Sequence, residues 1–439
     1  MKINFYNRPA APAIASLASA PSLASVAWPG KATAPNLPST NFPANVPAQV
    51  NLSVGDIALR AALDIRPRFL SPVLTTSLLG LFRSVLFAQT TGNAGSLTIK
   101  SSYRHMPSNW KRIFSETISS GIALTLSERV ADFPYFVPLE FCKTGALPAT
   151  RKWPAAIASL VPGQFEVNSR WGGLMPDYIV ARLENGVWKF ATVESKGRDS
   201  AVHTAKYGEY SKFKIQSMNA QLVPNPAFMG PAPAFAAHFL GVTAIRGKAV
   251  RTDTRSVRAR WFNHRQMDDI ADVPDRWGVE FVAGYYSAIL FRLGFTRLGN
   301  ALGAARLEPE RQRDGSEDLG AILNGADISS RFGLYETADH IFSAESLSGG
   351  VYRPVITEKA LDAVKLMMRA LRERDSDLYR EVNDLLFGVN RSVRELSQSE
   401  DFSTNVGRRM MDTKTARLSL STSGVGLVTE DLDLGDAEF

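Results

Sequence analysis

The residues whose types and spacing are best suited to chemistry are Asp177, Glu194 and Lys196. Two carboxylates that face each other across paired strands have Cβ atoms about 5 Å apart and repel each other. A divalent cation held between them would remove that repulsion. Lys196 lies two residues beyond Glu194 and points to the same side of a strand. The sequence therefore predicts a carboxylate–carboxylate–amine cluster, provided that a hairpin brings the two acids together.

The hairpin that meets this condition is centred on Asn185 and Gly186. Two runs of β-branched and aromatic residues flank it, 178–183 and 187–193. Asn-Gly between such runs is typical of a type I′ turn, because both central positions of that turn need a positive φ. Counting outward from the turn, Asp177 faces Glu194. Two aromatic residues on the Lys196 face are expected to anchor the hairpin in the core, Trp188 and Phe190.

Pro176-Asp177, followed after a gap by Glu194-Ser195-Lys196, resembles the signature of the PD-(D/E)xK nuclease superfamily, which includes many restriction endonucleases. The resemblance covers roughly Ser108 to Phe262, and the hairpin is its sharpest part. It implies an α/β fold of the restriction-endonuclease-like type, with a mixed sheet flanked by helices. In that family the two acids lie on neighbouring antiparallel strands.

The resemblance also implies a role for each residue of the cluster. Asp177 and Glu194 would bind the metal, and the carbonyl of Ser195 would be a further ligand. Lys196 would orient or deprotonate the attacking water and stabilise charge on the phosphate. Magnesium is the ion that the resemblance implies, with manganese as the alternative. The competing interpretation of the hairpin is a strand edge whose acids are solvated or paired with Lys196 and Arg198.

Members of the family often carry a further acid on the helix before the hairpin and a lysine or glutamine on the helix after it. The preceding helix is expected from Ser108 to about Val130, where Glu116 is the candidate. Its competitors are Glu128, Glu140 and Glu166. The following helix is expected over about 205–222, and Gln216 is favoured there as the residue near the scissile phosphate. The other candidates on it are Lys212, Lys214 and Gln221. Solvated residues with no catalytic role are the alternative for all of these.

The charge of the chain favours a polyanionic partner, with nucleic acid first. For the nuclease that the resemblance implies, DNA is favoured over RNA. The formal net charge is +7 at pH 7, and basic surfaces attract phosphate backbones. Candidates for contacts with a nucleic-acid backbone are Lys212, Lys214, Arg258 and Arg260. The two arginines belong to a strand expected over 256–262, after another expected over 237–245. Many mildly basic proteins bind no nucleic acid, so a solvated strand edge is the alternative for the arginines.

Other chemistries are poorly supported. The chain has one cysteine, Cys142, which excludes a disulfide framework and a multi-cysteine metal site. Five scattered histidines do not form a histidine-rich metal motif. The most apolar stretch, 69–88, contains Pro72 and Arg83, so we expect no transmembrane helix and no membrane partner. The cytoplasm is the default location.

Composition and periodicity predict five regions along the chain. Residues 1–52 are rich in Ala, Pro and Ser and are expected to be a disordered leader. Residues 53–106 are expected to be helical and 107–270 to form the nuclease-like core. Residues 271–397 are expected to be a helical C-terminal domain, with Thr357 as a helix N-cap. Residues 398–439 are expected to be a poorly ordered acidic tail, since 430–439 hold five acids and no base.

The resemblance thus implies a metal-dependent nuclease that hydrolyses phosphodiester bonds, and by analogy with the family its setting would be restriction, anti-phage defence or DNA repair. The alternative is a non-catalytic subunit that binds nucleic acid or assembles with other proteins through the C-terminal helices. Divalent-dependent cleavage discriminates between the two.

Overall fold

The computed structural model describes the following residues: 2–4, 49–51, 54–64, 86–89, 96–99, 106–143, 153–199, 207–230, 232–245, 255–265, 272–307, 330–332, 341–343, 352–398 and 416–430. The protein divides into two compact units. The first comprises 1–64, 79–151 and 161–277, and the second comprises 65–78, 152–160 and 278–439. The expected leader lies outside the described residues, except for two short paired strands, β1 (Lys2–Asn4) and β2 (Gln49–Asn51).

The first unit is built on a mixed sheet that has seven strands within the described residues, in the order β3-β4-β11-β10-β8-β7-β5. The strands are β3 (Leu86–Gln89), β4 (Ser96–Ile99), β5 (Tyr135–Pro138), β7 (Tyr178–Glu184), β8 (Val187–Asp199), β10 (Ala237–Ile245) and β11 (Arg255–Arg265). Neighbouring strands are antiparallel, except that β8 and β10 run parallel. The expected strands over 237–245 and 256–262 are therefore confirmed.

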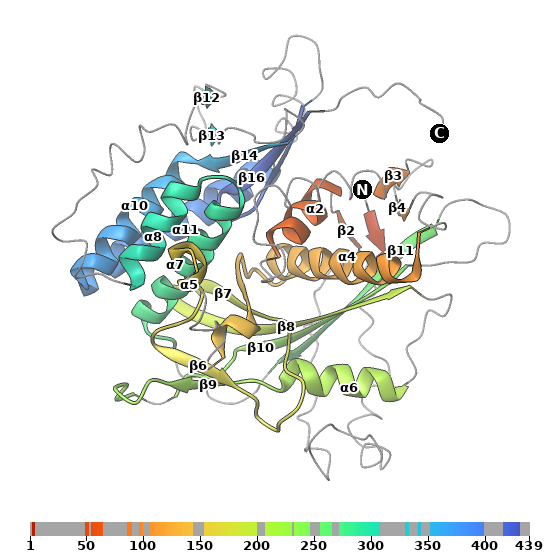
Figure 1. Ribbon diagram of the computed structural model, residues 1–439, viewed down its shortest axis with the longest axis horizontal. Coiled ribbons are helices and arrows are strands. Elements are labelled where there is room, and N and C mark those ends of the chain that lie inside the picture. Colours follow the sequence, from red (N-terminus) through yellow and green to blue (C-terminus); the bar gives the residue numbers. More distant parts are fainter. Residues whose placement is uncertain are drawn as a thin grey trace. The chain divides into compact units, whose positions relative to one another are not determined.

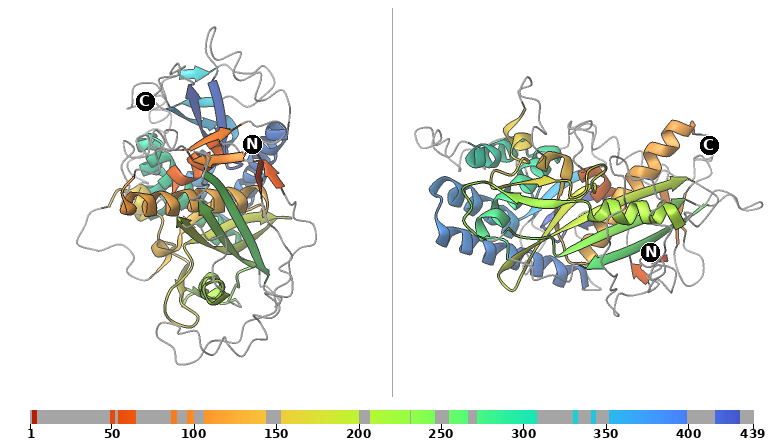
Figure 2. Two further views of the ribbon diagram at one scale, coloured as in Figure 1. Left: turned by 90° about the vertical axis from the view of Figure 1, so that its right-hand side faces the viewer. Right: turned by 90° about the horizontal axis from the view of Figure 1, so that it is seen from below.

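Two helices lie on opposite faces of this sheet, α4 (Ser108–Arg129) and α6 (Tyr207–Met218) (Figure 1). Seen from below, α6 lies across the sheet (Figure 2). The 3–4 spacing of apolar residues along α4 predicts its buried stripe correctly for Phe114, Ile118 and Ile122. Trp110 and Ile113, at the start of the same pattern, are exposed. The residue before the helix is Pro107, whose side chain makes no capping hydrogen bond.

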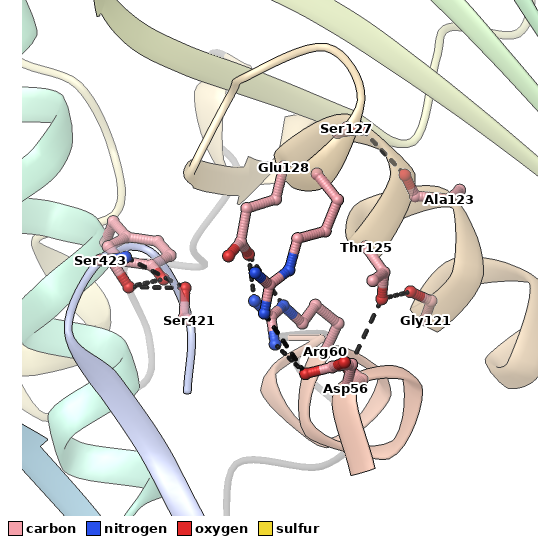
Figure 3. A network of polar contacts seen from close by, with 11 residues as sticks. Asp56, Arg60, Gly121, Ala123, Thr125, Ser127, Glu128, Ser421 and Ser423 are labelled. Atoms are coloured by element: carbon pink, nitrogen blue, oxygen red, sulfur yellow. Dashed lines mark hydrogen bonds and ion pairs between the residues drawn. The ribbon is translucent and has the colours of Figure 1, made fainter. Parts of the chain in front are cut away.

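A third helix, α2 (Val54–Leu63), packs against α4 and is joined to it by a buried ion pair. Arg60 and Glu128 are both buried, and Nε of Arg60 donates to Oε2 of Glu128 at 2.8 Å (Figure 3). Asp56 lies beside the pair, and its Oδ1 is 3.8 Å from Nη1 of Arg60 and 3.6 Å from Nη2 of Arg129. The two helices approach closely at Gly121, where a Cβ would lie 2.5 Å from the carbonyl oxygen of Ile57.

The second unit combines helices with a sheet that has five strands within the described residues, in the order β12-β13-β14-β16-β15. Its helices are α5 (Ala155–Ala158), α7 (Asp275–Arg292), α8 (Thr296–Leu307), α10 (Glu358–Glu373) and α11 (Ser376–Gln398). Its strands are β12 (Ser330–Phe332), β13 (Ile341–Ser343), β14 (Tyr352–Thr357), β15 (Ala416–Leu420) and β16 (Val425–Glu430). Thr357 caps α10 as predicted, since its hydroxyl accepts a hydrogen bond from the amide of Ala360.

Three regional predictions need correction. Among its described residues, the region 53–106 is helical only over α2, because 86–89 and 96–99 form the paired strands β3 and β4. The region 271–397 contains strands as well as helices, and the region 398–439 contributes β15 and β16 to the same sheet. The rest of that expected tail lies outside the described residues. None of the helices among the described residues is long and apolar enough to cross a membrane.

Candidate active site on β8 and the start of β7

The predicted hairpin is present, with the predicted register. Asn185 and Gly186 have φ angles of 53° and 78°, as a type I′ turn requires. The ladder between β7 and β8 runs from the Glu184–Val187 pair to the Tyr178–Val193 pair. Trp188 and Phe190 are fully buried, as expected of the residues that anchor the hairpin.

Asp177 is the residue immediately beyond the last pair of this ladder. Its carboxylate Oδ2 accepts a hydrogen bond of 2.8 Å from the backbone amide of Ser195. Its own amide donates to the carbonyl of Val193 at 3.0 Å, and its carbonyl accepts from Leu139 at 2.9 Å. The carboxylate thus occupies the place that a further carbonyl of β7 would take. Two of these hydrogen bonds attach Asp177 to residues 193 and 195, and the third attaches it to Leu139. The register is the predicted one, but the ladder ends one pair before the predicted pair of Asp177 and Glu194.

Glu194 and Lys196 come together on one face of β8. The side chain of Glu194 is fully buried, and the ammonium of Lys196 forms an ion pair with its Oε1. The Lys196 side chain remains 26% exposed and lies over the ring of Phe213 on α6, 5.5 Å from the ring centroid. A buried carboxylate needs a compensating cation, and in this structure Lys196 supplies it. Glu194 and Lys196 thus meet within β8, and the Asp177 carboxylate is bound to the amide of Ser195, the residue between them.

The opposite face of β8 lies against α4. The hydroxyl of Ser195 donates to that of Ser119 at 2.9 Å. Gly197 approaches α4 so closely that a Cβ would lie 2.0 Å from the carbonyl oxygen of Ser115. No side chain larger than hydrogen fits there without a shift of the backbone, so glycine at this position lets α4 support the strand that carries the cluster.

Gln216 is buried on α6 and forms a hydrogen bond with the segment that precedes Asp177. Its amide Nε2 donates to the carbonyl of Met175 at 3.0 Å. Asn219, which directly follows α6, makes a larger set of contacts with the preceding residues of the same segment. The sequence analysis did not single out Asn219, although an asparagine just past a helix C-terminus is a recognisable signal.

The candidate for a third acid, Glu116, is not gathered into the cluster. Its side chain is 53% exposed and forms an ion pair of 3.8 Å with Arg112 on its own helix. Among its competitors, Glu128 is committed to Arg60, while Glu140 and Glu166 are exposed. Over the part of the chain that the structure describes, no three His, Cys, Asp or Glu side chains form a group that could hold a metal ion.

Lys214 is buried rather than available for contact with a phosphate backbone. It is only 4% exposed, and its Nζ has no hydrogen-bond partner among the described residues. Burial lowers its pKa from 10.5 to about 8, because a charged amine is poorly solvated in the interior. The side chains of the other predicted nucleic-acid ligands lie outside the described residues: Lys212, Arg258 and Arg260. The two arginines lie in β11, opposite Ala244 and Val242 of β10.

We expect the Lys214→Met variant to be more stable than the wild type near neutral pH, by up to roughly 3 kcal/mol. The unfolded chain holds the Lys214 proton up to pH 10.5 and the folded chain only up to about pH 8. The cost of burying the charge is therefore complete below pH 8 and fades as the pH rises to 10.5. Urea unfolding at pH 7 and pH 10 measures this difference. Lys189→Met, at a partly exposed lysine paired with Asp272, is the control. An equal gain at both pH values would assign the effect to packing instead.

Comparisons with protein-family models, with curated proteins and with solved structures found no match for this chain.

Proposed function

We propose that the chain is a metal-dependent nuclease that hydrolyses phosphodiester bonds, with DNA favoured as substrate. The observation that carries the proposal is that the Asp177 carboxylate is bound to the Ser195 amide, between Glu194 and Lys196, which form an ion pair on β8. Asp177 directly precedes β7, whereas Glu194 and Lys196 lie within β8, and the side chain of Glu194 is fully buried. Such burial of an acid beside a lysine is unusual for a merely solvated strand edge.

The order of elements also supports the proposal. Helix α4 is followed by the antiparallel strands β5, β7 and β8, then by α6 and by β10, which runs parallel to β8. This is a mixed sheet flanked by helices, with the two acids at neighbouring antiparallel strands. The restriction-endonuclease-like core that the PD-(D/E)xK resemblance implies has these same features.

The residues present fit a magnesium ion. Its usual protein ligands are one or two carboxylates, and waters and substrate phosphates complete its coordination. Asp177 and Glu194 provide two carboxylates, and the Ser195 carbonyl directly follows Glu194 in the chain. Magnesium bound there would lower the pKa of a bound water and offset negative charge on the phosphate.

The chain's own groups have defined tasks in this proposal. The amide of Ser195 fixes the orientation of the Asp177 carboxylate. A cation held by Glu194 would compete with the Lys196 ammonium for the same carboxylate and would free that amine, part of whose side chain is already exposed to solvent. The released amine is then available to hold the attacking water or to donate to the phosphate.

We expect Lys196→Ala to remove magnesium-dependent cleavage while leaving most of the affinity for DNA. One amine among many basic groups contributes little to the total electrostatic attraction, whereas a group that assists proton transfer typically contributes about 100-fold or more to the rate. The measurements are cleavage of supercoiled plasmid and equilibrium binding of the same DNA. Lys189→Ala, at another ion-paired lysine of β8, is the matched control and should retain both activities. Wild-type rates in Lys196→Ala would contradict the proposed role.

A second candidate function is a non-catalytic subunit that binds nucleic acid or other proteins. It is favoured by the self-sufficiency of the cluster, because Lys196 already compensates Glu194 and the Ser195 amide already binds Asp177. The binding subunit predicts affinity for nucleic acid that falls steeply with added salt, together with no cleavage of any DNA or RNA in magnesium or manganese. Cleavage that disappears in Lys196→Ala would exclude it.

A further inference from the structure

The segment between β6 (Phe165–Asn168) and Asp177 is held in place by two buried amide side chains. Oδ1 of Asn219 accepts from the amide of Trp171 at 2.8 Å and from the hydroxyl of Ser169 at 3.4 Å. Its Nδ2 donates to the carbonyls of Gly172 and Leu174, each at 2.7 Å. Gln216 holds the next carbonyl, that of Met175. A connecting segment with this many contacts to one helix end is rigid rather than adaptable.

This rigid segment presents a large apolar side chain to solvent. Gly172 and Gly173 have φ angles of 78° and 79°, a conformation that other residues rarely adopt, and they turn the chain outward. Leu174 follows them and is 60% exposed, while Pro176 is buried again. A single exposed leucine is common on protein surfaces and needs no explanation by itself. Here the fold uses two buried amides and two glycines to hold the backbone beneath it.

The distance between Leu174 and the candidate active site is limited by their separation in the chain. Leu174 precedes Asp177 by three residues, so their Cα atoms are at most about 11 Å apart. Successive nucleotides of a strand rise by about 3.4 Å. A nucleic acid whose phosphate lies at Asp177 therefore has Leu174 within about three base steps of the point of cleavage. Arg170 lies over the ring of the partly exposed Trp171, 5.8 Å from its centroid, in the same segment.

We propose that Leu174 is an apolar wedge that enters the base stack of duplex DNA beside the phosphate bound at Asp177. Proteins that insert leucine or a similar side chain between base pairs unstack one step and bend the duplex. The free-energy cost of unstacking is lowest where the bases are already mismatched. The inference rests on the proposed nuclease function, and it names the substrate class as a duplex that is opened locally at the cleaved step.

The test uses a set of DNA duplexes in which 2-aminopurine replaces adenine at each position in turn, in buffer without divalent cations. The fluorescence of this base rises when it is unstacked. Wild-type protein should raise it several-fold at one or two neighbouring positions, and Leu174→Ser should remove most of the rise. Met229→Ser is the matched control, because Met229 is 96% exposed on another loop of the same unit. Bound DNA with no rise at any position, or an equal rise with Leu174→Ser, would overturn the wedge.

Cleavage of two substrates separates the wedge from the nuclease itself. On a fully paired duplex, we expect Leu174→Ser to be at least about tenfold slower than wild type in magnesium. On a duplex with a mismatch at the cleaved step, the two proteins should differ by less than about twofold, because that step is already open. Equal slowing on both substrates overturns the wedge while leaving the nuclease standing. A fluorescence rise without cleavage of either substrate overturns the nuclease and retains the wedge.

Discussion

Replacement of Asp177 by asparagine is expected to abolish magnesium-dependent cleavage and to leave the fold intact. The asparagine oxygen can still accept the hydrogen bond from the Ser195 amide, so the end of β7 keeps its attachment to β8. The amide has no negative charge to offset a divalent cation, and it is a poorer ligand than a carboxylate. Loss of a ligand should cost at least as much as loss of a residue that only orients one, which is about 10- to 100-fold. Manganese, which is less demanding of its ligands, should restore at most a trace of activity.

Two measurements are needed, phosphodiester cleavage in added magnesium and thermal unfolding without metal. Glu184→Gln is the matched control. Glu184 is an acid at the other end of the same hairpin, and it forms a partly exposed ion pair with Arg182. It should cleave DNA at the wild-type rate. Full activity in Asp177→Asn would refute catalysis by this cluster. A large loss of stability in the metal-free protein would instead make Asp177 a structural residue of the strand end.

The hairpin could be predicted from the sequence because its determinants are local. The positive φ angles at Asn185 and Gly186 and the alternation of side chains set the register of β7 and β8 without reference to the rest of the chain. That register puts Asp177 opposite Glu194, but it does not say whether the ladder extends as far as this pair. Its hydrogen bond to the Ser195 amide depends on where the ladder stops, which no local pattern specifies.

Contacts between residues far apart in the sequence were harder to predict. The sequence placed Lys214 on the correct helix but not in the interior, because burial depends on how α6 packs on the sheet. It also missed β15 and β16, which pair with each other across the turn at 421–424 and join the distant β14 through β16. The turn between them, Ser421–Gly424, is polar in composition but buried, and the hydroxyl of Tyr286 donates to the carbonyl of Ser423 at 2.6 Å. A polar stretch does not predict an exposed turn where its polar groups form hydrogen bonds with a neighbouring helix.

The ion pair between α2 and α4 is the other place where a single change should have a large effect. Arg60 and Glu128 are almost completely buried, and Arg60 binds one oxygen of Glu128 through two of its nitrogens (Figure 3). Removal of one partner of a buried pair leaves a charge whose desolvation is no longer compensated. Asp56 is less affected, because it keeps its ion pair with Arg129.

We expect Arg60→Met to lower the free energy of unfolding of the protein by about 3–5 kcal/mol. The double variant Arg60→Met/Glu128→Met should recover most of this loss, because apolar side chains of similar volume can replace a buried ion pair at little cost. Urea unfolding of the wild type, both single variants and the double variant measures the coupling between the two residues. Since α4 also supports β8 through Ser119 and Gly197, exchange of the Ser195 amide hydrogen should be faster in Arg60→Met and close to the wild-type rate in the double variant. Additive losses, with no recovery in the double variant, would show that the packing volume at this junction matters rather than the compensation of charge.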